Sequence, residues 1–321
     1  MVDIGYTLSS EEHAPNDLVG YAARAEDAAF DFLSISDHFH PWVSRQGESG
    51  FVWATLGGVA HATDDIPVGV GVVCPTMRYH PAIVAQASAT VASMFDGRFF
   101  LGLGTGELLN EHVVGEHWPE HAVRREMLAE AVQIIRRLWS GTQQSYHGDH
   151  FTVQNARLFT LPEDDPPIIV SAYGPAAAQL AADHGDGLWS VGPQGVVETW
   201  EDMGGDGPRY TQLSVCYAED EDDAIQTAYE WWPNTALPGE LSSQLPTTAH
   251  FEQACEMVEP EDVAASIVAG PDPDAYVAAV EEAVDAGYDH VYFHQIGPDQ
   301  ESFFEFYEQE LRPRFEERGW A

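Results

Sequence analysis

Short apolar segments alternate with amphipathic segments along the whole chain. The clearest of them, residues 67–73, reads Pro-Val-Gly-Val-Gly-Val-Val and contains no polar side chain. A strand with one face in water would alternate apolar and polar residues, so this run is typical of a parallel sheet that helices cover on both faces. Strands are predicted at 2–8, 32–36, 67–73, 98–104, 167–172, 187–190, 212–217 and 289–294.

Helical patterns fill most of the intervals between these strands. Helices are predicted at 15–29, 51–63, 81–94, 121–139, 175–184, 222–232 and 301–318, with one more that ends at 286–287. Strands that alternate with helices in this way predict an α/β fold of the (β/α)8 TIM barrel type. Barrels of this length fold as one unit, so a single domain over 1–321 is expected.

Two stretches interrupt the alternation. Residues 142–166 are predicted to leave the barrel and to form a hairpin around 147–149. Residues 233–259 are weakly patterned, and long segments of this kind are often functional. They are therefore the best candidate for an insertion that covers a substrate.

The charge balance is extreme. The chain has 53 acidic residues against 13 basic ones, all of them Arg, and its net charge is −40. The acids are spread along the chain rather than gathered in one segment, which argues against the alternative of an acidic protein that binds one basic partner. Molar salt shortens the Debye length to about 3 Å and would screen such a surface. The composition predicts a protein of an extreme halophile, and the lack of a basic stripe predicts no nucleic-acid partner.

Compartment and metal content follow from a few further features. No run approaches the roughly 20 uncharged apolar residues that span a bilayer, and the first residues lack the basic region of a signal peptide. Three widely separated cysteines, Cys74, Cys216 and Cys255, suggest no disulfide framework. We expect a cytoplasmic protein with no membrane contact. The spacing of His112, His117 and His121 mixes loop and helix, so we expect no metal site.

Polar residues follow directly after three neighbouring predicted strands. These segments are 37–42, 74–76 and 105–110. Loops after the strands of a barrel line its active-site face, so all three should meet at one mouth. His38 is the leading candidate for a general base, because an imidazole titrates near neutral pH. The alternative is a surface loop whose His38 and Trp42 merely pack against the rim.

Two glycine-containing turns are weaker candidates for anion binding. Backbone N–H groups around Gly104 and Gly106 could hold a phosphate, but the carboxylate of Glu107 would oppose an anion. A carboxylate near a ring nitrogen or a carbonyl group suits Glu107 better. Gly174 precedes a predicted helix, whose N-terminus carries partial positive charge, and is the more plausible seat for an anion.

Four motifs taken in order resemble the luciferase-like family of F420-dependent oxidoreductases, most closely the branch that contains F420-dependent glucose-6-phosphate dehydrogenase. They are Ser36-Asp37-His38-Phe39-His40-Pro41-Trp42, Cys74-Pro75-Thr76-Met77-Arg78-Tyr79-His80-Pro81, Gly102-Leu103-Gly104-Thr105-Gly106-Glu107-Leu108-Leu109-Asn110 and Ser171-Ala172-Tyr173-Gly174-Pro175. The likeness covers nearly the whole chain and implies a luciferase-like TIM barrel that forms a homodimer.

The resemblance implies a hydride exchange between a small-molecule substrate and C5 of the deazaflavin of coenzyme F420. In that branch, the histidine matching His38 takes the hydroxyl proton of the substrate. The tryptophan matching Trp42 steadies the histidine, and the glutamate matching Glu107 assists at the deazaflavin ring nitrogen. An indole beside His38 would also exclude water and stabilise the imidazolium through its π face.

The resemblance also implies the residues that hold the cofactor. Asp37 and Asn110 hold it, and a non-proline cis bond between Gly71 and Val72 backs its ring. Cys74 stands where the branch has a threonine that contacts the cofactor. The phosphate and tail are received by Ala172, Tyr173, Gly174, Val191 and Gly192.

The sequence departs from the branch where the sugar phosphate binds. The sugar-phosphate enzymes use two lysines and an arginine, and these positions correspond here to Gln194, a position near Ser242, and Ser266. A phosphate dianion without cationic partners would bind poorly in a partly buried site. We therefore expect an alcohol or an unphosphorylated sugar-like substrate. The alternatives are glucose-6-phosphate dehydrogenase proper, an FMN-dependent luciferase-like monooxygenase, or a barrel that has lost catalysis.

Overall fold

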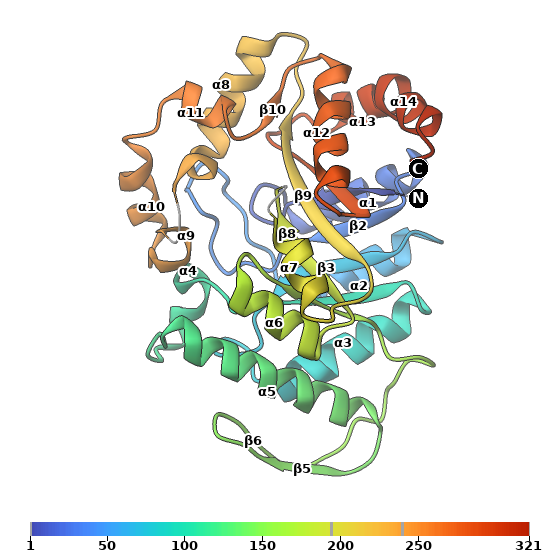
Figure 1. Cartoon of the computed structure of the whole chain (residues 1–321), viewed down its shortest axis with the longest axis vertical. Helices are drawn as coiled ribbons and strands as arrows, with labels where there is room; N and C mark the ends of the chain where they lie inside the picture. The colour runs from blue at the N-terminus through green and yellow to red at the C-terminus, as the bar shows by residue number, and fades with distance from the viewer. Residues whose placement is uncertain (1, 193–194, 239–240, 321) are drawn as a thin grey trace.

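The computed structural model describes residues 2–192, 195–238 and 241–320, and in them eight parallel strands close into a barrel surrounded by helices (Figure 1). The order around the barrel is β1, β2, β3, β4, β7, β8, β9 and β11, and β11 pairs again with β1. The bounds are β1 Asp3–Leu8, β2 Phe32–Ile35, β3 Val68–Val73, β4 Phe99–Leu103, β7 Ile168–Ser171, β8 Gly187–Val191, β9 Arg209–Cys216 and β11 His290–Gln295. The predicted (β/α)8 barrel is confirmed.

The helices cover the outside of the barrel and begin where the sequence offers start signals. Proline occupies the first turn of α1, α3, α6 and α12, where its missing N–H costs no hydrogen bond. The helices are α1 Pro15–Asp27, α2 Val52–Ala62, α3 Pro81–Phe95, α5 His121–Trp139, α6 Pro175–His184, α8 Glu221–Trp231, α12 Pro273–Asp285, α13 Glu301–Phe306 and α14 Arg312–Glu317. The predicted bounds 121–139 and 175–184 agree with α5 and α6 at both ends.

Aromatic rings from several strands pack against each other inside the barrel. The rings of Phe100 and Tyr210 stack with centroids 5.0 Å apart, and Trp189 stacks on Tyr210 at 5.1 Å. A Cβ added at Gly69 would lie 2.0 Å from Phe100, so only glycine leaves room for this ring. A Cβ at Gly71 would lie 2.3 Å from Trp189. The rings therefore pack directly against the strand that carries the Gly71–Val72 peptide.

Both interruptions of the barrel pattern contain secondary structure. The predicted hairpin is confirmed as β5 Gln144–His147 and β6 Thr152–Ala156. The described parts of 233–259 contain three short helices: η2 Pro233–Ala236, α9 Leu241–Gln244 and α10 Thr248–Cys255. Other short elements were not predicted: α4 Leu108–Glu111, η1 His112–Val114, α7 Val196–Asp202, α11 Pro260–Ala264 and β10 Val268–Ala269. Most have fewer than two helical turns, too few to show a helical period.

None of the helices in the described part of the chain is long and apolar enough to cross a bilayer.

Candidate active site

His38 lies at the mouth of the barrel, three residues beyond the end of β2, between two carboxylates. Its Nε2 is 3.4 Å from Oε1 of Glu11 and 3.8 Å from Oε2 of Glu107. Its Nδ1 lies 3.2 Å from the carbonyl oxygen of His40. Because that carbonyl can only accept a hydrogen bond, the contact requires a proton on Nδ1. Nε2 is the ring nitrogen that faces the two carboxylates.

Trp42 packs beside the imidazole of His38. The two ring centroids are 4.8 Å apart with an angle of 58° between the planes. Trp42 also packs edge to face against Phe251 of α10, at 5.0 Å. Its backbone N–H donates to Oε1 of Gln46 at 2.8 Å. The indole is therefore held between His38 and the segment that follows α8.

Glu11 is a site residue that sequence reasoning missed. It follows β1 and is buried, and its Oε2 accepts hydrogen bonds from the hydroxyls of Ser36 at 2.6 Å and Ser9 at 3.3 Å. Because Oε2 is engaged in these two bonds, Oε1 is the oxygen that faces His38. The available signal was its position, since Glu11 lies just past a predicted strand, where loops line the mouth.

Asn110 joins the His38 loop to Glu107. Its Oδ1 accepts from the backbone N–H groups of Phe39 at 2.9 Å and His40 at 3.2 Å. Its Nδ2 donates to Oε2 of Glu107 at 3.1 Å. Asn110 was predicted to hold a cofactor. The contacts described here show it fixing the His38 loop relative to Glu107.

A buried ion network lies beside this group. Nη2 of Arg78 is 2.8 Å from Oδ2 of Asp37, and the backbone N–H of Arg78 donates to Oε2 of Glu111 at 2.8 Å. The hydroxyl of Tyr79 donates a hydrogen bond to Oδ1 of Asp37 at 3.2 Å. Burial raises the pKa of Asp37 against the opposing effect of Arg78, and burial raises the pKa of Glu111 to about 7. Arg78 therefore ties together the loops after β2, β3 and β4.

Glu111→Gln is expected to remove part of the pH dependence of stability. Glu111 has a folded pKa of about 7, above its ordinary value of 4.5, so its contribution to stability is complete below pH 4.5 and is lost as the pH rises through 7. The free energy of unfolding of the wild type should fall across this window, and less so in Glu111→Gln. Denaturant titrations at several pH values measure it, with the exposed Glu198→Gln as control. Equal slopes in wild type and Glu111→Gln would contradict this assignment.

The residues predicted to hold a cofactor ring lie along β3 and its loop. The peptide bond between Gly71 and Val72 is cis, as the resemblance implied. Cys74 is buried, and its Sγ lies 3.0 Å from the hydroxyl of Thr76. A Cβ at Gly106, whose φ is +75°, would come within 2.5 Å of that sulfur. The loop after β4 therefore packs closely on Cys74.

The residues predicted to receive the cofactor tail lie after β7 and β8. Ala172 is buried, whereas Tyr173 is 57% exposed. A Cβ added at Gly174 or Gly192 would meet no atom within 4 Å. Val191 ends β8, next to Gly192. The backbone at these two loops is therefore open to an approaching ligand.

Helix α10 lies against the loop that carries His38 and Trp42. Besides the ring contact of Phe251, Thr248 donates from its hydroxyl to the carbonyl oxygen of Pro41 at 3.2 Å. The backbone N–H of Ser44 donates to Oε1 of Glu252 at 3.0 Å. These contacts place part of the 233–259 segment over the His38 loop.

The three positions that carry the phosphate-binding cations in the resembling branch lie in different surroundings, and one of them is not described. Gln194 lies outside the described residues. Ser242 is half-buried in α9, and Ser266 is exposed beyond α11, where its hydroxyl donates to the carbonyl oxygen of Asp262 at 3.1 Å. Within 2–192, 195–238 and 241–320, no group of three or more His, Cys, Asp or Glu residues is arranged to hold a metal ion.

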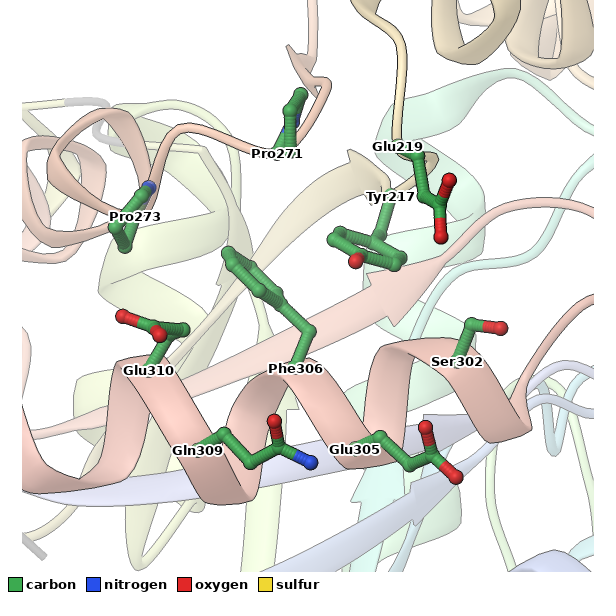
Figure 2. Close-up of a pocket in the computed structure, with 9 residues that line it drawn as sticks. All are labelled: Tyr217, Glu219, Pro271, Pro273, Ser302, Glu305, Phe306, Gln309 and Glu310. Carbon is green, nitrogen blue, oxygen red and sulfur yellow. The ribbon is translucent and has the colours of Figure 1, made fainter.

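A surface pocket of about 340 Å³ contains none of the predicted site residues (Figure 2). Figure 2 shows Ser302, Glu305, Phe306, Gln309 and Glu310 along one helical stretch that faces Tyr217. The rings of Tyr217 and Phe306 stack at 4.4 Å. The candidate chemistry lies elsewhere, at the mouth around His38.

Comparisons with known proteins agree with the likeness of the motifs. The family described as luciferase-like monooxygenase matches residues 2–290. F420-dependent glucose-6-phosphate dehydrogenases of Tsukamurella paurometabola and Mycobacterium avium are each 34% identical to the chain. The matches cover 99% of both chains in the first case and 98% of both in the second.

Solved structures with a similar fold agree with these sequence matches. An F420-dependent secondary alcohol dehydrogenase, in complex with an F420–acetone adduct, is 30% identical with a TM-score of 0.90, over 97% of this chain and 98% of that one. The coenzyme F420-dependent tetrahydromethanopterin reductase of Methanopyrus kandleri is 21% identical with a TM-score of 0.78, over 98% of this chain and 99% of that one, a likeness of fold.

Proposed function

This chain belongs to the luciferase-like monooxygenase family, and we propose that it is an F420-dependent oxidoreductase acting on an alcohol or an unphosphorylated sugar-like substrate. The observation that carries the proposal is the placement of His38, with its Nε2 at 3.4 Å and 3.8 Å from two carboxylates and Trp42 packed beside it. That placement suits a base that takes a proton from a hydroxyl group.

The loops at the mouth fit coenzyme F420. The glycines after β7 and β8 have open space where a side chain would stand, as a phosphate and tail require. The residues proposed to hold the cofactor are Asp37, Gly71, Val72, Cys74, Asn110, Ala172, Tyr173, Gly174, Val191 and Gly192. When bound, the deazaflavin of F420 supplies the carbon that accepts or gives the hydride.

His38 is proposed to move the hydroxyl proton through Nε2. The imidazolium that forms is stabilised by the carboxylates of Glu11 and Glu107 and by the π face of Trp42. Glu107 has a side chain 35% exposed, against 3% for Glu11. We therefore assign the stabilisation of the charge on His38 to the buried Glu11, and propose for the more exposed Glu107 the role that the resemblance implies, assistance at the ring nitrogen of the deazaflavin. Trp42 and α10 keep bulk water from the imidazole.

The charges at the mouth favour a neutral substrate. In the sequence, the loops that follow the barrel strands contain two arginines, Arg45 and Arg78, and no lysine. Arg78 is engaged by Asp37 and Glu111. Arg45 packs on the ring of Trp231 at 4.8 Å and lies 3.7 Å from Glu230. A sugar phosphate would therefore find each arginine of these loops next to an acidic residue, whereas an alcohol needs no cation.

A substrate panel tests this proposal. Purified protein in molar KCl should bleach oxidised F420 with at least one neutral alcohol, and we expect secondary alcohols to be the first to do so, given the similar dehydrogenase that carries an acetone adduct. Glucose 6-phosphate should give no bleaching above the rate without substrate. Robust bleaching by glucose 6-phosphate would refute the argument from the missing cations, and the relatives named as dehydrogenases of that compound would then be the better guide.

We also propose that the protein is a homodimer adapted to molar salt. The chain has 53 acidic residues, yet none lies in 49–63 or 66–95, the segments that contain α2 and α3. The exposed positions of α3 are uncharged: Ile83, Gln86, Thr90, Ser93 and Met94. Phe51, before α2, is 58% exposed. Two copies with a net charge of −40 repel each other, so a face without acids is where they can meet.

Sedimentation equilibrium in molar KCl should give twice the chain mass of 35.3 kDa. Gln86→Glu adds a charge to the exposed surface of α3 and is expected to weaken the dimer. Gln133→Glu makes the same change on the exposed face of α5 and should not. A monomeric wild type, or equal weakening by both substitutions, would argue against this face.

A further inference from the structure

We infer that Glu12 and His294 form a positioning pair that holds the loop after β1 so that Glu11 faces His38. The inference rests on the proposed function for the role of Glu11, but its geometric part does not. Glu11 and Glu12 are adjacent, and their side chains reach different partners. Glu11 faces the imidazole of the proposed base, whereas Glu12 reaches β11 and the turn that follows it.

Both carboxylate oxygens of Glu12 are used. Its Oε1 accepts from the backbone N–H of Gly297 at 2.8 Å, and its Oε2 lies 3.0 Å from Nε2 of His294. The Glu12 side chain is fully buried, and that of His294 is 2% exposed. A carboxylate so far from water is retained only where it is hydrogen-bonded and paired. The two contacts therefore define where Glu12 must lie.

Two further features fix the position of His294 besides its contact with Glu12. Its backbone is in β11, and its ring packs edge to face on Trp232 with centroids 4.4 Å apart. Trp232 follows α8 and begins the segment that continues into α10. Through this ring, the pair links the loop after β1 to the base of the segment that covers the His38 loop.

The position of Glu12 constrains Glu11, because neighbouring Cα atoms are about 3.8 Å apart and the peptide between them is planar. The carbonyl oxygen of Glu11 also accepts from the backbone N–H of Glu48, at 3.0 Å. A shift of Glu11 would therefore weaken the Glu48 bond as well as the approach to His38. Misplacing a catalytic group by about 1 Å can cost around 100-fold in rate. Glu12 and His294 are positioning residues, since neither contacts His38.

Amide hydrogen exchange tests the geometric part in the protein without added cofactor. Glu12→Leu should speed exchange by about tenfold at both Gly297 and Glu48, because the loop loses its anchor. Glu12→Gln should leave both close to wild type, because glutamine can still accept from Gly297 and bond to His294. Faster exchange at Gly297 with an unchanged Glu48 would overturn the inference, because Glu11 would then be held independently of the pair.

Kinetics test whether the pair acts through Glu11. Glu12→Leu is expected to lower kcat by about 10–100-fold with little change in the dissociation constant of F420, and Glu12→Gln should restore most of it. In a Glu11→Gln background, adding Glu12→Leu should cost little more. A full additional loss in that background would overturn the inference.

Glu130→Leu is the matched control. Glu130 is a buried carboxylate that accepts from the backbone N–H groups of Asp149, His150 and Phe151 in the outer hairpin. Its loss should lower stability and leave kcat unchanged. Absence of F420 turnover with every alcohol in the wild type would refute the proposed function, while the exchange result would still decide the positioning role.

Discussion

Replacing His38 with alanine is expected to lower turnover by about 10²–10⁴-fold while leaving the affinity for F420 nearly unchanged. The imidazole, which lies between Glu11 and Glu107, is the group proposed to take the hydroxyl proton, and alanine offers no replacement. Initial rates of F420 bleaching by a saturating alcohol measure the turnover, and a fluorescence titration measures the affinity.

His147→Ala is the control, because His147 is an exposed histidine on β5 of the outer hairpin. It should behave as wild type in both measurements. Unchanged turnover in His38→Ala would show that the base lies elsewhere. Loss of cofactor affinity in parallel with turnover would show that His38 holds the cofactor rather than moving a proton.

Replacing Arg78 with methionine is expected to lower the free energy of unfolding by about 3–5 kcal/mol. The Arg78 side chain is 8% exposed and lies between two carboxylates that are each 1% exposed, Asp37 and Glu111. Methionine fills much of the volume but leaves both acids without a cation. Denaturant unfolding in molar KCl measures the loss.

Two further variants sharpen this result. Arg136→Met breaks an exposed pair with Asp186 and should cost at most about 1 kcal/mol. Adding Asp37→Asn to Arg78→Met removes one of the stranded charges and should recover part of the lost stability. If Arg78→Met cost no more than Arg136→Met, the buried network would not hold the three loops together.

The general layout could be read from the sequence because it depends on local patterns. Apolar runs with no polar alternation predicted the buried strands, and the positions of the strand ends predicted that His38, Trp42 and Glu107 would lie at one mouth. The geometry brings these three together, and their roles remain predictions. Within 233–259, helices as short as α9 carry too few turns to be predicted.

The parts that were missed depend on tertiary contacts. Glu11 carries no motif, and its significance comes from two serine hydroxyls that turn it toward His38. Arg78 lies inside a motif with no assigned role, and its role follows only from two acids on other loops. The assignment of Asn110 to the cofactor stays a prediction, and its contacts add a link between the His38 loop and Glu107 that no motif indicated.

This chain belongs to a family named for monooxygenases, yet we infer that its cofactor is F420. A titration of the purified protein in molar KCl with F420 and, separately, with FMN measures this choice of cofactor. We expect saturable binding of F420 and no binding of FMN at the same concentrations. Binding of FMN without binding of F420 would show that the inference is wrong and would favour the FMN-dependent monooxygenase.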